Sequence, residues 1–121
     1  MSYIYGVPGN QASLRLTRRY DASPNDVWAA LSEDDSRSRW LAPPPDVEAT
    51  VRTVEPGRVL ELDWRRNGEP ESLVRLEVAA EASGSVVVLD HSRLDARICM
   101  RYFPFWTQRI ARLGRTLGAA A

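Results

Sequence analysis

The sequence of 121 residues contains no lysine, one cysteine and one histidine. Because all 16 basic residues are arginine, Schiff-base chemistry and every other mechanism that requires a lysine amine are excluded. The lone cysteine, Cys99, cannot form an intramolecular disulfide. One histidine and one cysteine fall short of the three or four ligands of a zinc site, so we expect no metal.

Cofactor motifs and long apolar runs are missing as well. The sequence has no nucleophile elbow, no phosphate-binding loop and no glycine-rich dinucleotide motif, so we expect no cofactor. No apolar stretch approaches the roughly 18 residues of a transmembrane helix, and residues 1–11 lack the features of a signal peptide. The formal net charge is zero, which creates no general attraction for nucleic acid or an anionic membrane. We therefore expect a cytoplasmic protein that binds neither.

The composition is that of a folded globular protein, with 44% hydrophobic and 26% charged residues. A chain of this length forms one domain with a core that needs neither a metal nor a disulfide. Gly6, Pro8, Gly9 and Asn10 indicate a loop before the first regular element. We therefore predict a flexible leader at residues 1–12 and a single domain at residues 13–121.

Patterns in the first part of this domain predict one strand and two short helices. Residues 13–20 alternate between polar and apolar side chains, as in a half-buried strand. Ser23 is placed to cap a helix, Pro24 suits the first turn of that helix, and an apolar stripe follows. A second short helix is expected at residues 33–40, because three successive prolines then prevent its continuation.

From residue 46 the apolar residues alternate with a period of two, which predicts an antiparallel meander. Turn signals divide it at Pro56-Gly57, Asn67-Gly68 and Ser83-Gly84. The spacing becomes helical again at residues 104–117, with an apolar stripe on one face. We predict an α+β fold: a curved antiparallel sheet of five to six strands, two short helices after the first strand, and a long C-terminal helix packed across the sheet.

Five short segments carry a family resemblance. They are Tyr-Asp-Ala-Ser-Pro-Asn-Asp-Val-Trp-Ala-Ala-Leu at 20–31, Arg-Trp-Leu at 39–41, Glu-Pro-Gly-Arg-Val-Leu-Glu-Leu-Asp-Trp at 55–64, Gly-Ser-Val-Val-Val-Leu-Asp-His at 84–91, and Phe-Trp at 105–106. In this order they resemble the SRPBCC, START or birch-pollen-allergen-like superfamily. Within it, they resemble the homologues of the activator of heat-shock protein 90 ATPase, which are polyketide cyclase-like. The resemblance covers nearly all of residues 13–118.

The resemblance implies a helix-grip fold, in which a curved antiparallel sheet wraps around the C-terminal helix, often with an apolar cavity between them. Members of the family usually have a further hairpin before the turn at Pro56-Gly57, whereas only residues 42–54 are available here. The resemblance therefore implies a shortened chain, in which we expect a new sheet edge to be exposed. We predict that a homodimer covers this edge.

His91 is the one candidate for acid or base chemistry. It alternates with Val87 and Leu89 and so shares their side of a strand, which we expect to face the helix. Because histidine titrates near neutral pH, His91 is either an acid, base or ligand contact in a cavity, or a core residue with one polar partner. Cys99 lies between two arginines, which favours a reactive thiolate, but a small buried hydrophobe is the commoner role of cysteine.

Aromatic and polar residues near the expected cavity form the predicted ligand site. Our first interpretation is the binding of a small hydrophobic or aromatic molecule between the sheet and the C-terminal helix. The alternatives are a polyketide cyclase-like enzyme in which His91 moves a proton, and a co-chaperone-like module that binds another protein. The predicted ligand-binding residues are Trp40, Trp64, Leu89, His91, Arg101, Tyr102 and Trp106.

Overall fold

A computed structural model describes residues 2–7 and 11–120 of the chain. In this part of the chain, six strands and three helices form two layers. In chain order they are β1 (Ser2–Val7), β2 (Gln11–Tyr20), α1 (Pro24–Ser32), α2 (Asp34–Leu41), β3 (Val47–Glu55), β4 (Val59–Arg66), β5 (Ser72–Glu81), β6 (Gly84–Asp95) and α3 (Ala96–Ala120).

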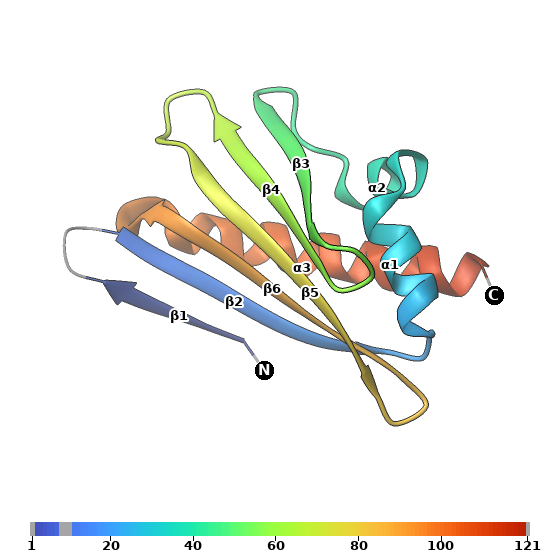
Figure 1. Cartoon of the computed structure of the whole chain (residues 1–121). Helices are drawn as coiled ribbons and strands as arrows, with labels where there is room; N and C mark the ends of the chain where they lie inside the picture. Colours follow the sequence, from blue (N-terminus) through green and yellow to red (C-terminus); the bar gives the residue numbers. More distant parts are fainter. Residues whose placement is uncertain (1, 8–10, 121) are drawn as a thin grey trace.

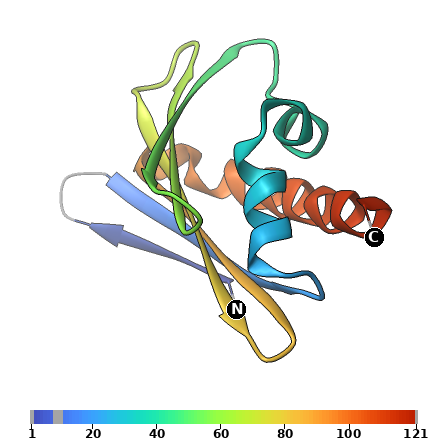
Figure 2. The ribbon, with the colours of Figure 1, turned by 45° about the vertical axis from the view of Figure 1, so that its right-hand side comes forward.

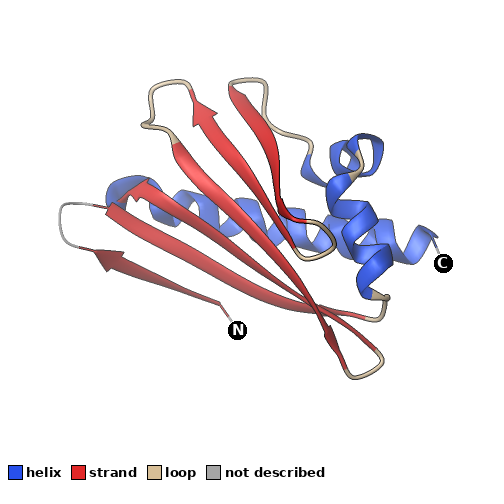
Figure 3. Ribbon diagram, viewed as in Figure 1, coloured by secondary structure: helices blue, strands red, loops and turns tan. Residues whose placement is uncertain are grey.

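The sheet is antiparallel, in the order β1-β2-β6-β5-β4-β3, so β1 and β3 are its edge strands (Figure 1). The helices lie on one face of the sheet (Figure 3). The sheet curves toward that face and partly surrounds α3 (Figure 2). The predicted α+β class, with two short helices and a long C-terminal helix, is confirmed.

Side chains alternate between the two faces of the sheet. On the helix-facing side, Leu62, Leu76 and Leu89 are fully buried, and Leu76 lies directly opposite Leu89 in the register of β5 and β6. On the other side, Arg15 of β2 bridges Asp90 of β6 at 2.8 Å. This period of two places the core under the sheet and the charges toward water, as the sequence pattern predicts.

Helix α1 begins as predicted. The Ser23 side chain accepts a hydrogen bond from the backbone N–H of Asp26 at 3.1 Å, and Pro24 occupies the first helical position. Upstream, Ser85 of β6 donates its hydroxyl to the carbonyl of Ala22 at 2.6 Å. Two hydrogen bonds therefore hold the connection from β2 to α1 in place: the bond from Ser85 at the start of β6, and the capping bond of Ser23.

Arg109 of α3 forms hydrogen bonds to the C-terminal end of α2. Arg109 donates from Nε to the carbonyl of Leu41 at 2.7 Å and from Nη2 to the carbonyl of Ala42 at 3.2 Å. The same guanidinium lies 4.3 Å from the ring centroid of Phe105, a cation–π distance. Because Ala42 ends α2 in a left-handed conformation with φ 37°, Arg109 satisfies carbonyls that the helix leaves unpaired.

Within the predicted leader, residues 2–7 form a strand and not the expected loop. Ser2–Val7 form β1 and pair with β2, with Ser2 opposite Leu16 and Val7 opposite Gln11. The β-branched and aromatic residues of Tyr-Ile-Tyr-Gly-Val favour a strand, and the turn-forming residues after them are typical of a hairpin connection. Residues 8–10, on which the loop prediction partly rested, lie outside the described residues.

The C-terminal helix begins eight residues earlier than residue 104, where the periodicity placed it. Helix α3 starts at Ala96, directly after Asp95, whose carboxylate accepts from the backbone N–H of Arg97 at 2.9 Å. Pro104 therefore lies inside the helix, where it removes the hydrogen bond to the carbonyl of Met100. Pro104 and Met100 are both exposed, so the proline lies on the outer side of the helix. The 25-residue helix is about 37 Å long.

Candidate functional site

A cluster of aromatic rings fills the space between the sheet and the first half of α3. It contains Trp64 of β4, His91 of β6, and Tyr102, Phe105 and Trp106 of α3. The ring centroids of His91 and Tyr102 are 4.6 Å apart, and those of Trp64 and Trp106 are 5.2 Å apart. All members except Phe105 are almost completely buried. We call these five residues the aromatic cluster.

His91 is held from both sides of its ring. The indole N–H of Trp106 donates to Nδ1 of His91 at 2.9 Å, so Nδ1 carries no proton. In the neutral ring Nε2 is then protonated, and it donates to the hydroxyl of Ser72 at 2.8 Å. These two bonds fix both the tautomer and the orientation of the imidazole.

A second pair of bonds leads from the aromatic cluster toward the surface. The indole N–H of Trp64 donates to the hydroxyl oxygen of Tyr102 at 3.1 Å. Tyr102 in turn donates its own proton to Oε1 of Glu69 at 2.7 Å. Burial, and then the hydrogen bond to Glu69, raise the pKa of Tyr102. The phenol thus stays protonated and serves as a donor at neutral pH.

The electrostatics of His91 and Cys99 favour their structural interpretations. Burial lowers the pKa of His91 from its ordinary 6.5 to about 3, so the ring is neutral at physiological pH. With both ring nitrogens engaged, it has no free position for proton transfer to a ligand. Burial also raises the pKa of Cys99, which is 1% exposed. Its thiol remains protonated, in agreement with the expectation of a small buried hydrophobe.

The structure brings together four of the seven residues predicted to bind a ligand. Trp64, His91, Tyr102 and Trp106 meet in the aromatic cluster. Leu89 is fully buried on the same face of β6 as His91. The other two residues, Trp40 and Arg101, lie elsewhere.

Trp40 is buried where the two short helices meet, and its indole N–H donates to the carbonyl of Ala30 in α1 at 2.9 Å. Arg101 is exposed and lines a small cleft of about 270 Å³ together with Glu69 and Arg97. Trp40 thus stabilises the helix pair, and Arg101 lines the same small cleft as Glu69, whose carboxylate accepts the hydrogen bond from Tyr102.

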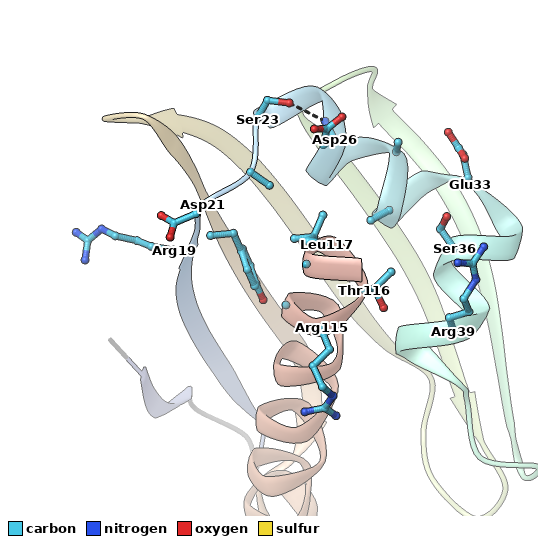
Figure 4. A pocket seen from close by; sticks show the side chains of 16 residues that line it. Arg19, Asp21, Ser23, Asp26, Glu33, Ser36, Arg39, Arg115, Thr116 and Leu117 are labelled. Carbon is cyan, nitrogen blue, oxygen red and sulfur yellow. Dashed lines mark hydrogen bonds between the residues drawn. The ribbon is translucent and has the colours of Figure 1, made fainter. Parts of the chain in front are cut away.

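A larger cleft, of about 910 Å³, lies at the other end of α3. Figure 4 shows its walls: Ser23 and Asp26 at the start of α1, Ser36 and Arg39 on α2, and Leu117 near the end of α3. We call it the end cleft. Its complete lining is Arg19, Tyr20, Asp21, Ala22, Ser23, Asp26, Ala29, Ala30, Glu33, Ser36, Arg39, Gly114, Arg115, Thr116, Leu117 and Gly118.

The inner part of the end cleft is apolar and its polar groups are already bonded. Tyr20 donates its hydroxyl to the carbonyl of Ile110 in α3 at 2.9 Å. Burial raises the pKa of this phenol, which keeps it protonated. Thr116 donates to the carbonyl of Arg112 at 3.1 Å. What remains toward the interior is the side of the Tyr20 ring, together with alanine, glycine and Leu117.

The charged residues of the end cleft lie at its rim. Among them, Asp21, Asp26 and Glu33 are exposed carboxylates, and Arg39 and Arg115 are exposed guanidinium groups. The lining has as many acidic as basic residues, three of each when Arg19 is included. The end cleft therefore has an apolar floor and a rim of mixed charge.

Sequence reasoning missed the end cleft and two members of the hydrogen-bond network, Ser72 and Glu69. The network could not be found, because its partners are distant in sequence and common in type. The end cleft left a weak signal in the small residues Ala29 and Ala30 of α1 and in Gly114 and Gly118 of α3, which leave space where two helices approach.

Within residues 2–7 and 11–120, no three histidine, cysteine or acidic side chains gather in a way that could hold a metal ion. In the same residues, no helix combines the length and the apolar character needed to cross a membrane.

Comparison with known proteins rests on structure, since no family model and no curated protein matches the sequence. The crystal structure of CalU16 from Micromonospora echinospora superimposes with a TM-score of 0.83 at 22% identity, covering 97% of this chain and 85% of that one. The AHSA1 (SPO3351) protein from Silicibacter pomeroyi gives a TM-score of 0.75 at 23% identity, covering 90% and 99%.

DynU16, described as a putative protein in the dynemicin biosynthetic locus, gives a TM-score of 0.77 at 20% identity. The match covers 93% of this chain and 49% of DynU16. At these identities the likeness concerns the fold. CalU16, DynU16 and AHSA1 are polyketide cyclase-like SRPBCC proteins, so the expected resemblance is confirmed at the level of structure. The chain therefore has the same fold as CalU16, DynU16 and the AHSA1 (SPO3351) protein, with an antiparallel sheet packed against a long C-terminal helix.

Proposed function

We propose that the protein binds a small, mainly apolar molecule, and that the end cleft is the binding site. The observation that carries the proposal is a contrast between the two ends of the grip. At one end the aromatic cluster is closed by side-chain hydrogen bonds. At the other end a cleft of about 910 Å³ with an apolar floor opens between α1, α2 and α3.

The volume and the lining of the end cleft support this proposal. Small-molecule sites measure roughly 300–1,000 Å³ and combine an apolar wall with a few polar groups. Here Ala30 and Leu117 are buried and supply apolar contacts, while Ser36 and Arg39 at the rim supply polar ones. Affinity would come from the apolar area that the ligand removes from water.

A ligand within the aromatic cluster would have to displace packed rings. Within the part of the chain that the structure describes, every buried side-chain nitrogen and oxygen atom has a hydrogen-bond partner. Moving Tyr102 or His91 aside would leave buried polar groups unpaired, at roughly 1–3 kcal/mol each. Ligand contacts at the predicted residues of the cluster therefore remain a prediction that requires an open state.

The cyclase-like alternative depended on His91 as an acid or base. The low pKa of His91 and its bonds to Trp106 and Ser72 favour a structural role instead. Binding without catalysis thus has the better physical support.

The proposal can be tested with the fluorescent probe N-phenyl-1-naphthylamine, an uncharged aromatic molecule. Gly118→Trp would place an indole in the end cleft, because a Cβ atom at Gly118 meets nothing within 4 Å. Met100→Trp is the matched control, since it adds the same side chain at an exposed position of the same helix, outside the cleft lining. We expect the first variant to abolish probe binding and the second to retain it.

Backbone NMR spectra recorded during the titration locate the bound probe. Binding in the end cleft shifts the amide signals of Tyr20, Ala29 and Gly114. Shifts confined to Trp64, His91 and Trp106 would contradict the proposal and favour the aromatic cluster. Absence of any binding by this probe and by a fragment library would contradict both sites.

A further inference from the structure

We propose that two copies of the protein associate through strand β3, which pairs with its own counterpart in an antiparallel, two-fold arrangement centred on Thr50. The proposal is independent of the ligand site. Strand β3 lies at one edge of the sheet and pairs with β4 along one side. Among residues 2–7 and 11–120, no strand pairs with its other side.

The backbone of β3 shows which groups face the open side. The carbonyl of Asp46, just before β3, accepts from the N–H of Asn67, just after β4, at 3.1 Å. Backbone direction alternates along a strand, so even-numbered residues face β4 and odd-numbered residues face the open edge. The N–H of Val47 already donates to the carbonyl of Pro44. Ala49, Val51 and Thr53 therefore present backbone groups to a partner strand, and Ala49 and Val51 are the two that flank Thr50.

A two-fold axis at Thr50 matches these groups. Ala49 then lies opposite Val51 of the partner subunit, and both belong to the odd-numbered set, so the two residues exchange hydrogen bonds. Their side chains point to the helix-facing side of the sheet, where both are only half-buried within one chain. Pairing would extend the apolar layer across the junction and cover them further.

The charges on β3 favour the same register. Glu48 and Arg52 are exposed on the outer face, two residues before and two residues after Thr50. With the axis at Thr50, each Glu48 lies opposite Arg52 of the partner subunit, which creates two opposite-charge pairs. An axis at residue 48 would oppose two glutamates, and an axis at residue 52 would oppose two arginines. Like charges directly opposite each other destabilise a sheet.

Within one chain, Glu48 is the member of this pair that is still available. Arg52 bridges Glu61 at 2.9 Å and Asp63 at 3.3 Å, both on β4. Among the described residues, Glu48 forms no salt bridge, although it lies opposite Arg65 in the register of β3 and β4. A guanidinium group has five N–H donors, so Arg52 retains capacity for a further carboxylate.

Cysteine cross-linking tests the register directly. Residues at the axis form a non-hydrogen-bonded pair with Cα atoms about 4.5 Å apart, which lies within the disulfide range of about 4.4–6.8 Å. We expect Thr50→Cys to form a covalent dimer under mild oxidation by oxidised glutathione. Glu48→Cys is the control, because its two thiols would lie four residues apart along the strands, at about 13 Å. The native Cys99 is 1% exposed and does not compete.

Light scattering after size exclusion tests the association without a cross-link. Glu48→Arg replaces two attractive pairs by two repulsive ones, so we expect at least tenfold weaker dimerisation. Asp35→Arg is the control, since it makes the same charge change at an exposed position of α2. A dimeric wild type and Asp35→Arg with a monomeric Glu48→Arg would support the proposal.

Three results would overturn the dimer proposal. The first is a wild-type protein that is monomeric at the concentration of an NMR sample. The others are equal cross-linking of Thr50→Cys and Glu48→Cys, and a dimer that Glu48→Arg leaves intact. None of these results bears on the end cleft, so the ligand proposal and the dimer proposal succeed or fail separately.

Discussion

The indole N–H of Trp106 donates to Nδ1 of His91 across 2.9 Å, joining helix α3 to strand β6 inside the core. This bond explains why the single histidine of the chain is buried. A neutral imidazole offers one acceptor and one donor, and the core supplies an indole donor and the Ser72 hydroxyl in the matching places. The helix and the sheet are therefore linked by directional bonds as well as by apolar contact.

The burial of His91 predicts a dependence of stability on pH. Its folded-state pKa of about 3 lies below the unfolded value near 6.5, so the unfolded chain binds the proton first as pH falls. The contribution is fully present above pH 6.5 and is lost toward pH 3, by up to about 1.4 kcal/mol per pH unit. Urea unfolding at several pH values measures this slope. His91→Gln cannot titrate, so the slope of the variant should be shallower, and equal slopes would contradict the prediction.

Removal of the Ser72 hydroxyl should destabilise the protein. In Ser72→Ala the Nε2–H of His91 loses its acceptor in a buried site, at a cost of about 1–3 kcal/mol. Ser92→Ala is a matched control on the neighbouring strand, because its hydroxyl is only half-buried and makes one long bond of 3.5 Å. Chemical denaturation should show a clear loss for the first variant and a change below about 0.5 kcal/mol for the second. Similar losses for both would show that the network around His91 contributes little.

Glycine is required at the start of β6. A Cβ atom on Gly84 would lie 2.2 Å from the carbonyl oxygen of Tyr20, a backbone atom that cannot move without shifting the end of β2. We expect Gly84→Ala to destabilise the protein by about 2 kcal/mol or more, the cost of overpacking and backbone displacement. Thermal unfolding provides the measurement, and an unchanged midpoint would show that β2 and β6 separate here at little cost.

The opposite result is expected for Gly114 in α3. A Cβ atom there would lie 3.4 Å from the Tyr20 ring, at ordinary contact distance, and glycine is a poor residue for a helix interior. Gly114→Ala should stabilise the protein by about 0.5–1 kcal/mol. The same variant narrows the end cleft and should weaken binding of N-phenyl-1-naphthylamine. A destabilised variant would show that the Tyr20 ring has no freedom to adjust.

Local sequence patterns predicted the parts of the fold that local chemistry determines. Ser23 and Pro24 mark the start of α1 because capping depends on neighbours in the chain. The alternation through β4, β5 and β6 determined the buried face, including the side on which His91 lies. Pro104 misled the prediction of α3, because proline is favoured in the first turn of a helix, whereas here it lies at an exposed position inside a longer one.

The candidate sites depended on contacts that no local pattern encodes. His91, Trp64 and Trp106 were predicted as ligand contacts, and the structure buries all three between the sheet and α3. Contact with a ligand stays a prediction. The hydrogen bonds of His91 to Trp106 and Ser72, and of Trp64 to Tyr102, follow from strand register and from the path of α3, which the sequence does not specify. The end cleft results from small residues on separate helices, and their proximity depends on how α1 and α3 cross.

Arg109 of α3 is bonded to the end of α2 and does not belong to the lining of the end cleft. Ser36 and Arg39, at the rim of the end cleft, belong to α2, and two carbonyls at the C-terminal end of this helix accept N–H groups of Arg109. If the end cleft is the binding site, the position of its rim depends in part on a residue outside its lining. On that proposal, a substitution at position 109 would change the rates of ligand association and dissociation without removing a direct contact to the ligand.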